Sequence, residues 1–464
     1  MSRYTNVIAA ASTPPGKGGV AVIRMSGDGA IDIAKKVFFP RGRRTFSEIA
    51  PRTQVYGDII EDGEAIDDVL LTVFPAPHSY TGEDTVEISC HGGILVTRCV
   101  LEALFRAGAI PAQAGEFTRR AFINGRLTLT EAEAIGELLE AKTREQMRLS
   151  SSKQRSLLSG KISELRALIT ETLSSMYARI DYPDEDLGDF TDAELSVRLG
   201  EAISKIERLL STYRTGRAIS EGVSTVICGK PNVGKSSLYN LLLGEDAAIV
   251  TSISGTTRDV LTRSVGLGKI TLNLADTAGI REGEDLDAVE EIGIRKSREM
   301  IEKSELLFAI FDISRPFDDE DKEILSAIEN SSAAKIAIIN KSDLSPLFDV
   351  DLLAGRFDFT VTLSVKDGGE EVISELTEIV DSLFADEKIN VKEDAIIHSA
   401  RQHASITRAL DLLRLAKGAI DAGAPQDAVS SDLERALGAL SELDGRAVSE
   451  EIVADIFSKF CVGK

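Results

Sequence analysis

Cysteine is scarce in this chain of 464 residues, which has only four: Cys90, Cys99, Cys228 and Cys461. Four scattered thiols are too few for a disulfide framework and are typical of a reduced, cytosolic protein. Long apolar runs are also missing, since no stretch reaches the roughly 18 residues that a membrane-spanning helix needs. Residues 1–8 contain no apolar segment or cleavage-like site of a signal peptide. These absences predict a soluble, cytoplasmic protein.

Positive charge is in deficit. Lys and Arg number 53 and Asp and Glu 75, which gives a formal net charge of −22. A protein that coats nucleic acid nonspecifically needs an excess of Lys and Arg, so that class is disfavoured. Residues 104–155 hold nine Lys or Arg and six Glu, 9 − 6 = +3. This small local excess fits a nucleic-acid-facing patch and an ordinary helix surface about equally well.

The hydrophobic pattern changes along the chain, and 464 residues are enough for two or three domains of roughly 100–200 residues. Residues 1–120 have mixed strand and helix patterns. Strands are predicted at 20–24, 68–74 and 85–89, and a helix at 94–107, closed by Gly108. Helix-spaced apolar residues then dominate 121–220 and return at 385–464. Long helices are predicted at 130–149, 154–181 and 193–214.

Between the two helical regions, residues 221–384 alternate strand and helix patterns, as in an α/β domain with a parallel sheet. A helical region on both sides of this block predicts that the block is inserted into one helical domain. The predicted fold class is therefore an α+β N-terminal domain and an α-helical domain into which a P-loop α/β domain is inserted.

A phosphate-binding loop stands at residues 229–236, Gly-Lys-Pro-Asn-Val-Gly-Lys-Ser, between the apolar run 223–228 and a helix-like segment 237–243. It fits GxxxxGK[ST] in its strand–loop–helix context, where backbone N–H groups surround phosphates at a helix N-terminus. Lys235 would reach the β- and γ-phosphates, and the Ser236 hydroxyl would bind Mg²⁺. The alternative is a chance glycine-rich turn.

Three further motifs in the right order favour a nucleotide site. Gly-Thr-Thr-Arg-Asp at 255–259 supplies Thr257 for Mg²⁺, and Asp-Thr-Ala-Gly at 276–279 supplies a carboxylate and a glycine N–H. Asn-Lys-Ser-Asp at 340–343 specifies GTP, because its final carboxylate accepts two hydrogen bonds from guanine that adenine cannot donate. The predicted fold of 221–384 is thus a Ras-like G domain. The residues predicted to bind GTP are Asn232, Val233, Gly234, Lys235, Ser236, Ser237, Thr251, Ser252, Ile253, Ser254, Gly255, Thr256, Thr257, Asp276, Thr277, Ala278, Gly279, Asn340, Lys341, Asp343, Ser364, Val365 and Lys366.

The usual water-positioning residue of a Ras-like GTPase is missing. A Gln normally follows the glycine of the Asp-x-x-Gly motif, and Ile280 stands there instead. Either the protein is a slow switch, or another polar residue enters the site. Acidic residues follow in 282–291, and most of them fit a solvated surface; Arg258 and Arg281 are nearby, but no arginine finger is evident.

Further motifs lie outside the nucleotide elements. They are TPPGKGG at 13–19, RMSG at 24–27, YTGED at 80–84, CHGG at 90–93, AGEFTRRAF at 114–122, NGRL at 124–127, IDYP at 180–183 and CVGK at 461–464. With the GTPase motifs, they make the chain resemble the MnmE (TrmE) family of tRNA modification GTPases nearly end to end. The AGEFTRRAF and CVGK segments are the most specific.

The resemblance implies a domain organisation and a reaction. Residues 1–120 would bind a tetrahydrofolate one-carbon donor (5-formyl- or methylene-tetrahydrofolate) and dimerise, 121–220 and 385–464 would form the helical domain, and 221–384 the G domain. The homodimer would work with an FAD-dependent partner, MnmG (GidA), in a heterotetramer or larger complex. Together they would add an aminomethyl or carboxymethylaminomethyl group to C5 of the wobble uridine of certain tRNAs.

The resemblance also implies how hydrolysis is activated. K⁺ would bridge the nucleotide phosphates, with Asn232, Thr251, Ile253 and Thr256 as ligands, and G domains would pair across it. Such a cation does the electrostatic work of an arginine finger.

The family's water-orienting Glu lies in a V-E-x-I-G segment, which is 289–293 in this chain. This alignment selects Glu290. Because the preceding linker 281–288 is slightly long for the family, Glu291 stays open as an alternative.

The implied folate ligands are Arg24, Glu87, Arg126 and Lys464. A carboxylate suits the N–H groups of a pterin, and cations suit a polyglutamate tail. Arg126 stands where Lys is common, and the two are not equivalent donors. Cys461 would lie near the folate, either with a role in the chemistry or as a small structural residue.

Two other functions stay open on the sequence. One is a regulatory GTP switch that assists ribosome assembly, although no RNA-binding module is evident. The other is a folate-binding module whose GTPase controls only assembly. Folate retention by the isolated residues 1–120 and loss of wobble-uridine modification on deletion would together separate these three functions.

Overall fold

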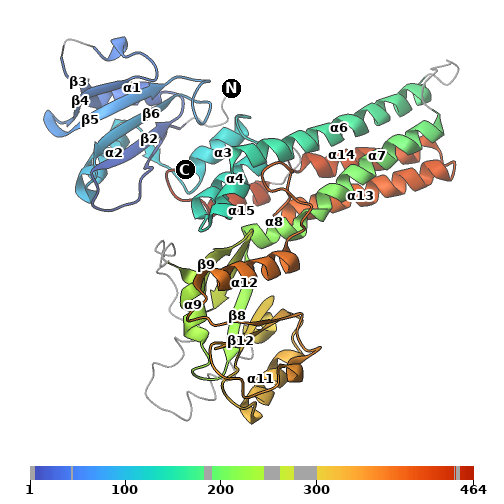
Figure 1. Ribbon diagram of the computed structural model, residues 1–464. Coiled ribbons are helices and arrows are strands. Elements are labelled where there is room, and N and C mark those ends of the chain that lie inside the picture. The colour runs from blue at the N-terminus through green and yellow to red at the C-terminus, as the bar shows by residue number, and fades with distance from the viewer. Residues whose placement is uncertain are drawn as a thin grey trace. The chain divides into compact units, whose positions relative to one another are not determined.

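A computed structural model describes residues 6–42, 45–181, 191–244, 262–275, 300–443, 445 and 450–464 (Figure 1). The chain forms two compact units. The first unit combines Met1–Gly136 with Ser441–Lys464, and the second unit is Glu137–Leu440. Among the described residues, no helix is both long and apolar enough to cross a membrane.

The first unit contains a seven-stranded sheet in the order β3-β4-β5-β6-β2-β1-β7. Its strands are β1 (Ile8–Ala11), β2 (Val20–Ser26), β3 (Phe38–Pro40), β4 (Gln54–Glu61), β5 (Glu64–Phe74), β6 (Thr85–His91) and β7 (Ile110–Pro111). All neighbours are antiparallel except β1 and β7. The helices α1 (Ala30–Val37) and α2 (Ile94–Ala107) share one buried apolar cluster with the strands. A short 3₁₀ helix, η1, spans Phe46–Glu48.

The helix predicted at 94–107 is confirmed as α2 with the same bounds, and Gly108 ends it with a φ of 125°. The predicted strands lie within β2, β5 and β6. Strand β4 was not predicted. Its apolar pattern is interrupted by Gly57. Glycine is required at this position, because a Cβ there would lie 2.5 Å from the Phe38 ring.

The rest of the first unit comes from both ends of the chain. Helices α3 (Glu116–Ile123), α4 (Leu129–Glu140) and α15 (Glu450–Ser458) meet around a small apolar cluster that includes Phe457 and Phe460. The last residues then pair with the segment before α3 through an isolated bridge between Ala114 and Val462.

A buried ion cluster joins three of the motifs in the first unit. The Arg120 side chain is 1% exposed, and its guanidinium donates to Glu83 at 3.2 Å and to Glu116 at 2.9 Å. Ser26 donates to the same Glu83 carboxylate at 3.2 Å. The RMSG, YTGED and AGEFTRRAF motifs therefore meet in one polar core.

Replacing Arg120 by Leu is expected to lower the free energy of unfolding by about 3–5 kcal/mol, because the buried Glu83 carboxylate and the partly buried Glu116 carboxylate would lose their counter-charge. Urea unfolding of the full chain measures this. The matched control is Arg98→Gln, whose ion pair with Glu102 has side chains 67% and 47% exposed. The control should change the free energy by less than about 1 kcal/mol, and an equally small effect of Arg120→Leu would contradict the prediction.

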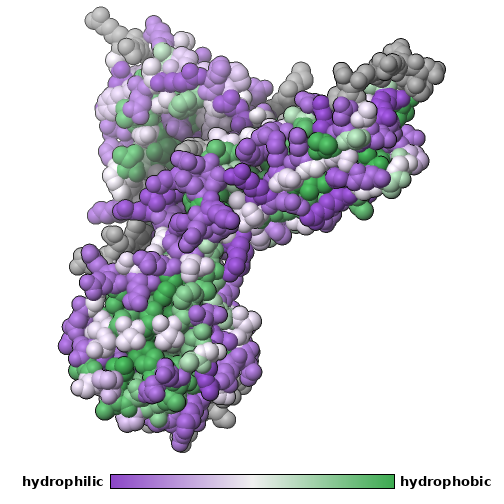
Figure 2. Space-filling model, turned by 45° about the vertical axis from the view of Figure 1, so that its right-hand side comes forward, coloured by the Kyte–Doolittle hydropathy of each residue, from purple (hydrophilic) through white to green (hydrophobic). Residues whose placement is uncertain are grey.

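The second unit begins with a helical part. It contains α5 (Arg144–Leu149), α6 (Ser152–Asp181), α7 (Asp192–Ser211), α8 (Tyr213–Ser220), α13 (Ala400–Asp421) and α14 (Gln426–Ser441). The long helices α6 and α13 both pack against α7 (Figure 1). The face of this bundle seen in Figure 2 is mostly hydrophilic. Among the apolar side chains of the bundle, Val197 of α7 and Leu415 of α13 are exposed.

The single helix predicted at 130–149 is wrong, because the chain forms α4 and α5 with a break between them. Thr143 starts the new helix: its hydroxyl accepts a hydrogen bond from Gln146 N, and the Gln146 side chain accepts one from Thr143 N. This capping box stabilises a helix start and competes with a continuous helix. The predicted helix at 193–214 likewise divides, since α7 ends at Ser211 and α8 begins at Tyr213.

The second unit also contains a six-stranded sheet in the order β13-β12-β11-β8-β10-β9. Its strands are β8 (Val223–Gly229), β9 (Thr262–Leu267), β10 (Ile270–Ala275), β11 (Leu306–Asp312), β12 (Ala334–Asn340) and β13 (Phe359–Thr362). All neighbours are parallel except β9 and β10, so the predicted parallel sheet is confirmed.

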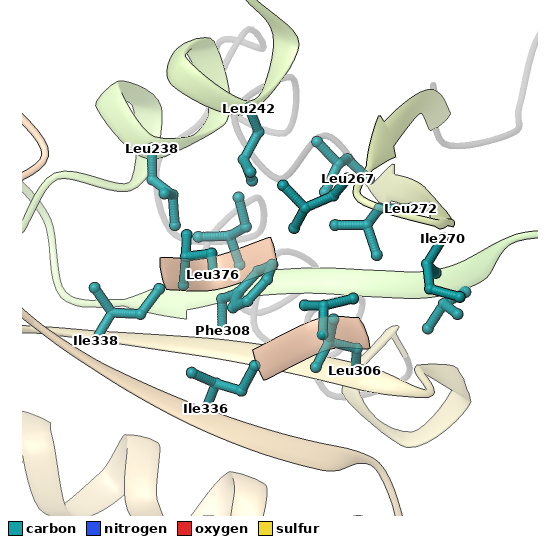
Figure 3. Packing of buried hydrophobic residues seen from close by; sticks show 14 of the residues in the cluster. Leu238, Leu242, Leu267, Ile270, Leu272, Leu306, Phe308, Ile336, Ile338 and Leu376 are labelled. Atoms are coloured by element: carbon teal, nitrogen blue, oxygen red, sulfur yellow. The ribbon is translucent and has the colours of Figure 1, made fainter. Parts of the chain in front are cut away.

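Helices cover both faces of this sheet. On one face α9 (Lys235–Leu243) and α12 (Gly369–Phe384) pack, and Leu238 and Leu242 of α9 point into the cluster around Phe308 (Figure 3). Leu149 of α5 and Ile219 of α8 belong to the same cluster. The other face is covered by α11 (Asp319–Glu329). A 3₁₀ helix, η4, spans Val350–Leu353.

Candidate functional site

The predicted phosphate loop connects β8 to α9, at the carboxyl end of a central strand. Gly229 has a φ of 146°, and a Cβ there would lie 2.5 Å from Ile310 O. Gly234 has a φ of 114°, and a Cβ there would lie 2.1 Å from Asn340 Nδ2. Both positions therefore require glycine, because the loop is folded tightly against the neighbouring strands.

Lys235 is the first residue of α9, and its ammonium points back into the loop. Its Nζ donates to the backbone oxygens of Gly229 at 2.8 Å and Lys230 at 2.6 Å. The first N–H groups of a helix have no partner within the helix, so the start of α9 can bind an anion. Ser236 and Ser237 are exposed there. Together the loop and its lysine form a positively polarised cradle.

The predicted base-binding loop joins this cradle through Asn340. Its side-chain amide donates to Val233 O at 2.7 Å, and its side-chain oxygen accepts from Val365 N at 3.0 Å. Ser342 N donates to Leu363 O at 3.3 Å. One buried asparagine thus ties the phosphate loop to both base-contacting segments, the Asn-Lys-Ser-Asp loop at 340–343 and the predicted weaker base-contacting loop Leu-Ser-Val-Lys at 363–366.

Asp343 and Lys366 are exposed beside these segments, while Val365 is buried and Ser364 half-buried. The Ser364 hydroxyl donates to Asp367 at 3.2 Å. The exposed Asp343 carboxylate is therefore available to a base that enters from solvent.

Charged residues that the sequence analysis did not select hold both loops. Lys230 Nζ lies 2.8 Å from an Asp318 oxygen and 2.7 Å from an Asp321 oxygen. Burial lowers the pKa of Lys230, but the bonds to the two carboxylates outweigh this and raise its pKa above the ordinary value. The sequence signals only the helix start, since Asp318 and Asp321 form a capping box. Their pairing with Lys230 joins distant parts of the chain, Lys230 and Asp318 being separated by 88 positions.

Asp312 is the second such residue. Its carboxylate lies 2.5 Å from Lys341 Nζ, and its side chain is 1% exposed. Burial raises the pKa of Asp312, but the bonds from Lys341 and Ser314 prevail and hold its pKa below the ordinary value. Only its position at the end of a fully buried strand hints at this role.

Several predicted site residues lie outside the described part of the chain. They are Thr251, Ser252, Ile253, Ser254, Gly255, Thr256, Thr257, Asp276, Thr277, Ala278, Gly279 and Glu290. Strand β10 ends at Ala275, directly before the Asp-Thr-Ala-Gly motif, and β8 beside it leads into the phosphate loop. The adjacent strand ends are consistent with one site.

The donor chemistry of the described residues fits the predicted ions. Ser236 places an exposed hydroxyl at the start of α9, and hydroxyl oxygens suit Mg²⁺. Asn232 is exposed and has a φ of 64°. Its side-chain amide oxygen could contribute to a K⁺ site.

The predicted folate residues gather in the first unit. Arg24 and Glu87 face each other across β2 and β6, with Arg24 Nε 2.9 Å and Nη2 2.8 Å from Glu87 Oε1. Both bonds go to the same oxygen. The Arg24 guanidinium also lies over the rings of Tyr80 and Phe117, at 5.2 and 5.8 Å from their centroids. A half-exposed charged pair thus stands beside two aromatic rings, which suits a flat heterocycle.

The other predicted folate residues contact the two segments that carry these rings, residues 80–84 and 114–122. Lys464 O accepts from Phe117 N at 3.1 Å. The side chain of Arg126 lies beside Gly82 in the YTGED loop, where a Cβ would come within 3.2 Å of its Cγ. Cys461 is exposed, and its carbonyl accepts from Gly115 N at 3.4 Å. The residues come from four separate segments, and the fold brings those segments together.

Comparisons with known proteins agree along the whole chain. The family model described as "GTP-binding protein TrmE N-terminus" matches residues 7–126, and the "MnmE helical domain" matches residues 129–461. Proteins named tRNA modification GTPase MnmE are similar over 99% of both chains. The one from Carboxydothermus hydrogenoformans is 40% identical over 471 residues, that from Acetivibrio thermocellus 40% over 465, and that from Natranaerobius thermophilus 39% over 461.

Proposed function

This chain belongs to the MnmE family of tRNA modification GTPases, and from that premise we propose that it hydrolyses GTP in the course of tRNA wobble-uridine modification. The observation that carries the GTPase part is the junction at Asn340, which joins the phosphate loop to both base-contacting segments. Residues 221–384 are then the G domain, inserted between two parts of the helical domain.

The proposed reaction adds an aminomethyl or carboxymethylaminomethyl group to C5 of the wobble uridine. An MnmG-type partner would supply FAD, and a tetrahydrofolate derivative would supply the one-carbon unit. Deleting the gene and analysing tRNA nucleosides by mass spectrometry tests this directly. The modified uridine should disappear and return with the wild-type gene. Unchanged modification would leave a GTP switch without this reaction.

Within the site, each described residue has a defined task. Lys235 would exchange its two backbone oxygens for phosphate oxygens, since charge-assisted bonds to phosphate are the stronger ones. Mg²⁺ would be held by Ser236 and Thr257 and would neutralise charge on the phosphates. Asp343 would accept hydrogen bonds from guanine, while Asn340 holds the phosphate loop and the base-contacting segments together.

Asp343→Asn is expected to weaken GTP binding about 10–100-fold, because a carboxamide cannot accept both guanine hydrogen bonds and a polar group is left unpaired. The same variant should accept xanthosine triphosphate. Titration with fluorescent derivatives of GTP and xanthosine triphosphate measures both dissociation constants. The matched control is Asp351→Asn, which changes an exposed aspartate eight positions further along the chain. Unchanged GTP affinity in Asp343→Asn would remove this residue from the site.

We further propose that Arg24, Glu87, Arg126 and Lys464 bind the folate, with Cys461 at its edge. Tyr80 and Phe117 would contact the pterin ring, and the second oxygen of Glu87 would accept from its N–H groups. The support is geometric: the charged pair and both rings already lie together.

Arg24→Ala and Glu87→Ala are each expected to abolish binding of 5-formyltetrahydrofolate, while GTP turnover stays within about twofold, because the residues lie in different compact units. Equilibrium dialysis and a GTPase assay measure the two activities. Arg41→Ala is a close control, since Arg41 likewise pairs with a carboxylate, that of Asp58, and lies over a tyrosine ring. Joint loss of both activities in a folded variant would contradict the two-site arrangement.

We also propose that K⁺ activates GTP hydrolysis. K⁺ held by Asn232, Thr251, Ile253 and Thr256 would supply positive charge at the phosphates, and G domains of a homodimer would pair across it. Glu290 would orient the attacking water, because Ile280 has no polar group for the task.

A further inference from the structure

The connection from β11 to α11, taken with the last residue of β11 and the first turn of α11 (residues 312–321), contacts both halves of the nucleotide site. At its start Asp312 pairs with Lys341 of the base-binding loop. At its end Asp318 and Asp321 pair with Lys230 of the phosphate loop. The connection itself belongs to none of the nucleotide motifs. Its acids nevertheless pair with Lys230 of the phosphate loop and with Lys341 of the base-binding loop.

On the side of the base-binding loop, both oxygens of the buried Asp312 carboxylate have partners. One Asp312 oxygen accepts from Ser314 N at 3.0 Å and Ser314 Oγ at 2.6 Å. The other faces Lys341 Nζ at 2.5 Å and Arg315 Nε at 3.4 Å. A carboxylate that is 1% exposed depends on such partners, and losing its charge leaves Lys341 without its nearest anion.

The phosphate-side contact joins the loop to a helix start. Asp318 is the N-cap of α11, and its other oxygen accepts from Glu320 N and Asp321 N. Asp321 in turn accepts from Asp318 N at 3.1 Å. The Lys230 side chain, 8% exposed, therefore pairs with both acids of this capping box.

Both loops also contain a residue in a strained conformation. Asn232 and Lys341 each have a φ of 64°, which side-chain-bearing residues rarely adopt. Such conformations persist where surrounding contacts hold them. Lys341 is itself the strained residue and forms an ion pair with Asp312. Lys230, which pairs with Asp318, lies two positions before the strained Asn232. The 312–321 connection is thus placed to maintain both.

We propose that residues 312–321 form a clamp that positions the two nucleotide-binding loops. Asp312 is the positioning residue for guanine selectivity, because it fixes the loop that carries Asp343. The pairing of Lys230 with Asp318 and Asp321 sets affinity for the phosphates. This inference rests on the proposed GTP binding and adds residues that act through the loops.

The test compares GDP with inosine diphosphate, which lacks the 2-amino group that Asp343 would bind. Asp312→Asn should weaken GDP binding about tenfold and should weaken inosine diphosphate binding by a smaller factor. The ratio of the two affinities, which measures the preference for GDP, should therefore decrease. Lys230→Met should weaken both about tenfold, with the preference unchanged, and Lys230→Arg should restore most of the affinity. Saturated GTP turnover should stay within about threefold in Asp312→Asn, since Asp312 lies outside the nucleotide motifs and acts through Lys341.

Lys322→Gln is the matched control, because Lys322 forms an exposed pair with Asp319 on the same helix. Melting temperatures identify the folded variants, and Ser314→Ala, which removes only one bond to Asp312, replaces Asp312→Asn if that variant does not fold. Folded clamp variants with wild-type affinities would overturn the clamp. An equal loss for both nucleotides in Asp312→Asn would overturn its role in selectivity. A wild-type protein without guanine preference would instead overturn the GTP site.

Discussion

Glu290→Ala is expected to lower kcat for GTP hydrolysis by about 10²-fold or more, the scale of losing a general base or water-orienting group. GTP affinity should change little, because the residue would contact the attacking water and leave the nucleotide contacts intact. The reason for expecting one dominant acid is Ile280, whose apolar side chain stands where a glutamine would position the water.

Steady-state turnover and nucleotide titration of the same preparations separate kcat from affinity. Glu291→Ala is the matched control, since it removes the neighbouring carboxylate in the same V-E-x-I-G segment. The control should retain most of the activity. A fully active Glu290→Ala protein would contradict the assignment and move the role to Glu291 or Glu282.

GTP turnover of the wild-type protein is expected to be on the order of 10²-fold faster in K⁺ than in Na⁺. An arginine finger contributes 10³–10⁵-fold to related enzymes, and a cation bridging the phosphates would do the same electrostatic work. A Na⁺ ion is too small to span the same oxygens. Turnover per chain should also rise with protein concentration if two G domains meet across the ion.

Matched K⁺ and Na⁺ buffers of equal ionic strength make the comparison, because salt alone screens charged contacts. Asn232→Ala should lose the K⁺ response. Asn240→Ala, an exposed asparagine on α9, should keep it. Equal wild-type rates in the two salts would exclude the cation mechanism.

Local sequence patterns predicted the elements whose causes are local. Helix α2 was predicted with its bounds because an apolar stripe runs from Ile94 to a terminating Gly108. The break between α4 and α5 was not predicted, since no glycine or proline marks it. It depends on the Thr143 capping box and on burial of Leu149 against the second unit's sheet, and the second of these contacts is distant in sequence.

In the nucleotide site, too, local motifs were predictable and contacts between distant residues were not. The phosphate loop and Asn340 were selected from motifs, because their contacts to a ligand require particular residues at fixed spacing. Lys230 was overlooked as a contact residue because its partner Asp318 lies 88 positions away, and Asp312 because Lys341 lies 29 positions away. Such pairs arise from the order of strands in the sheet, which a motif does not encode.

The two-part composition of the first unit has a consequence for synthesis on the ribosome. Ser12 donates to Gly463 O at 3.0 Å, and a side chain at Gly463 would lie 2.1 Å from Ala11 O, so the final residues fit closely against the first strand. Residues 441–464 emerge only after the whole of 137–440 has been translated. The unit that starts the chain therefore completes its packing last, after the second unit has had time to fold.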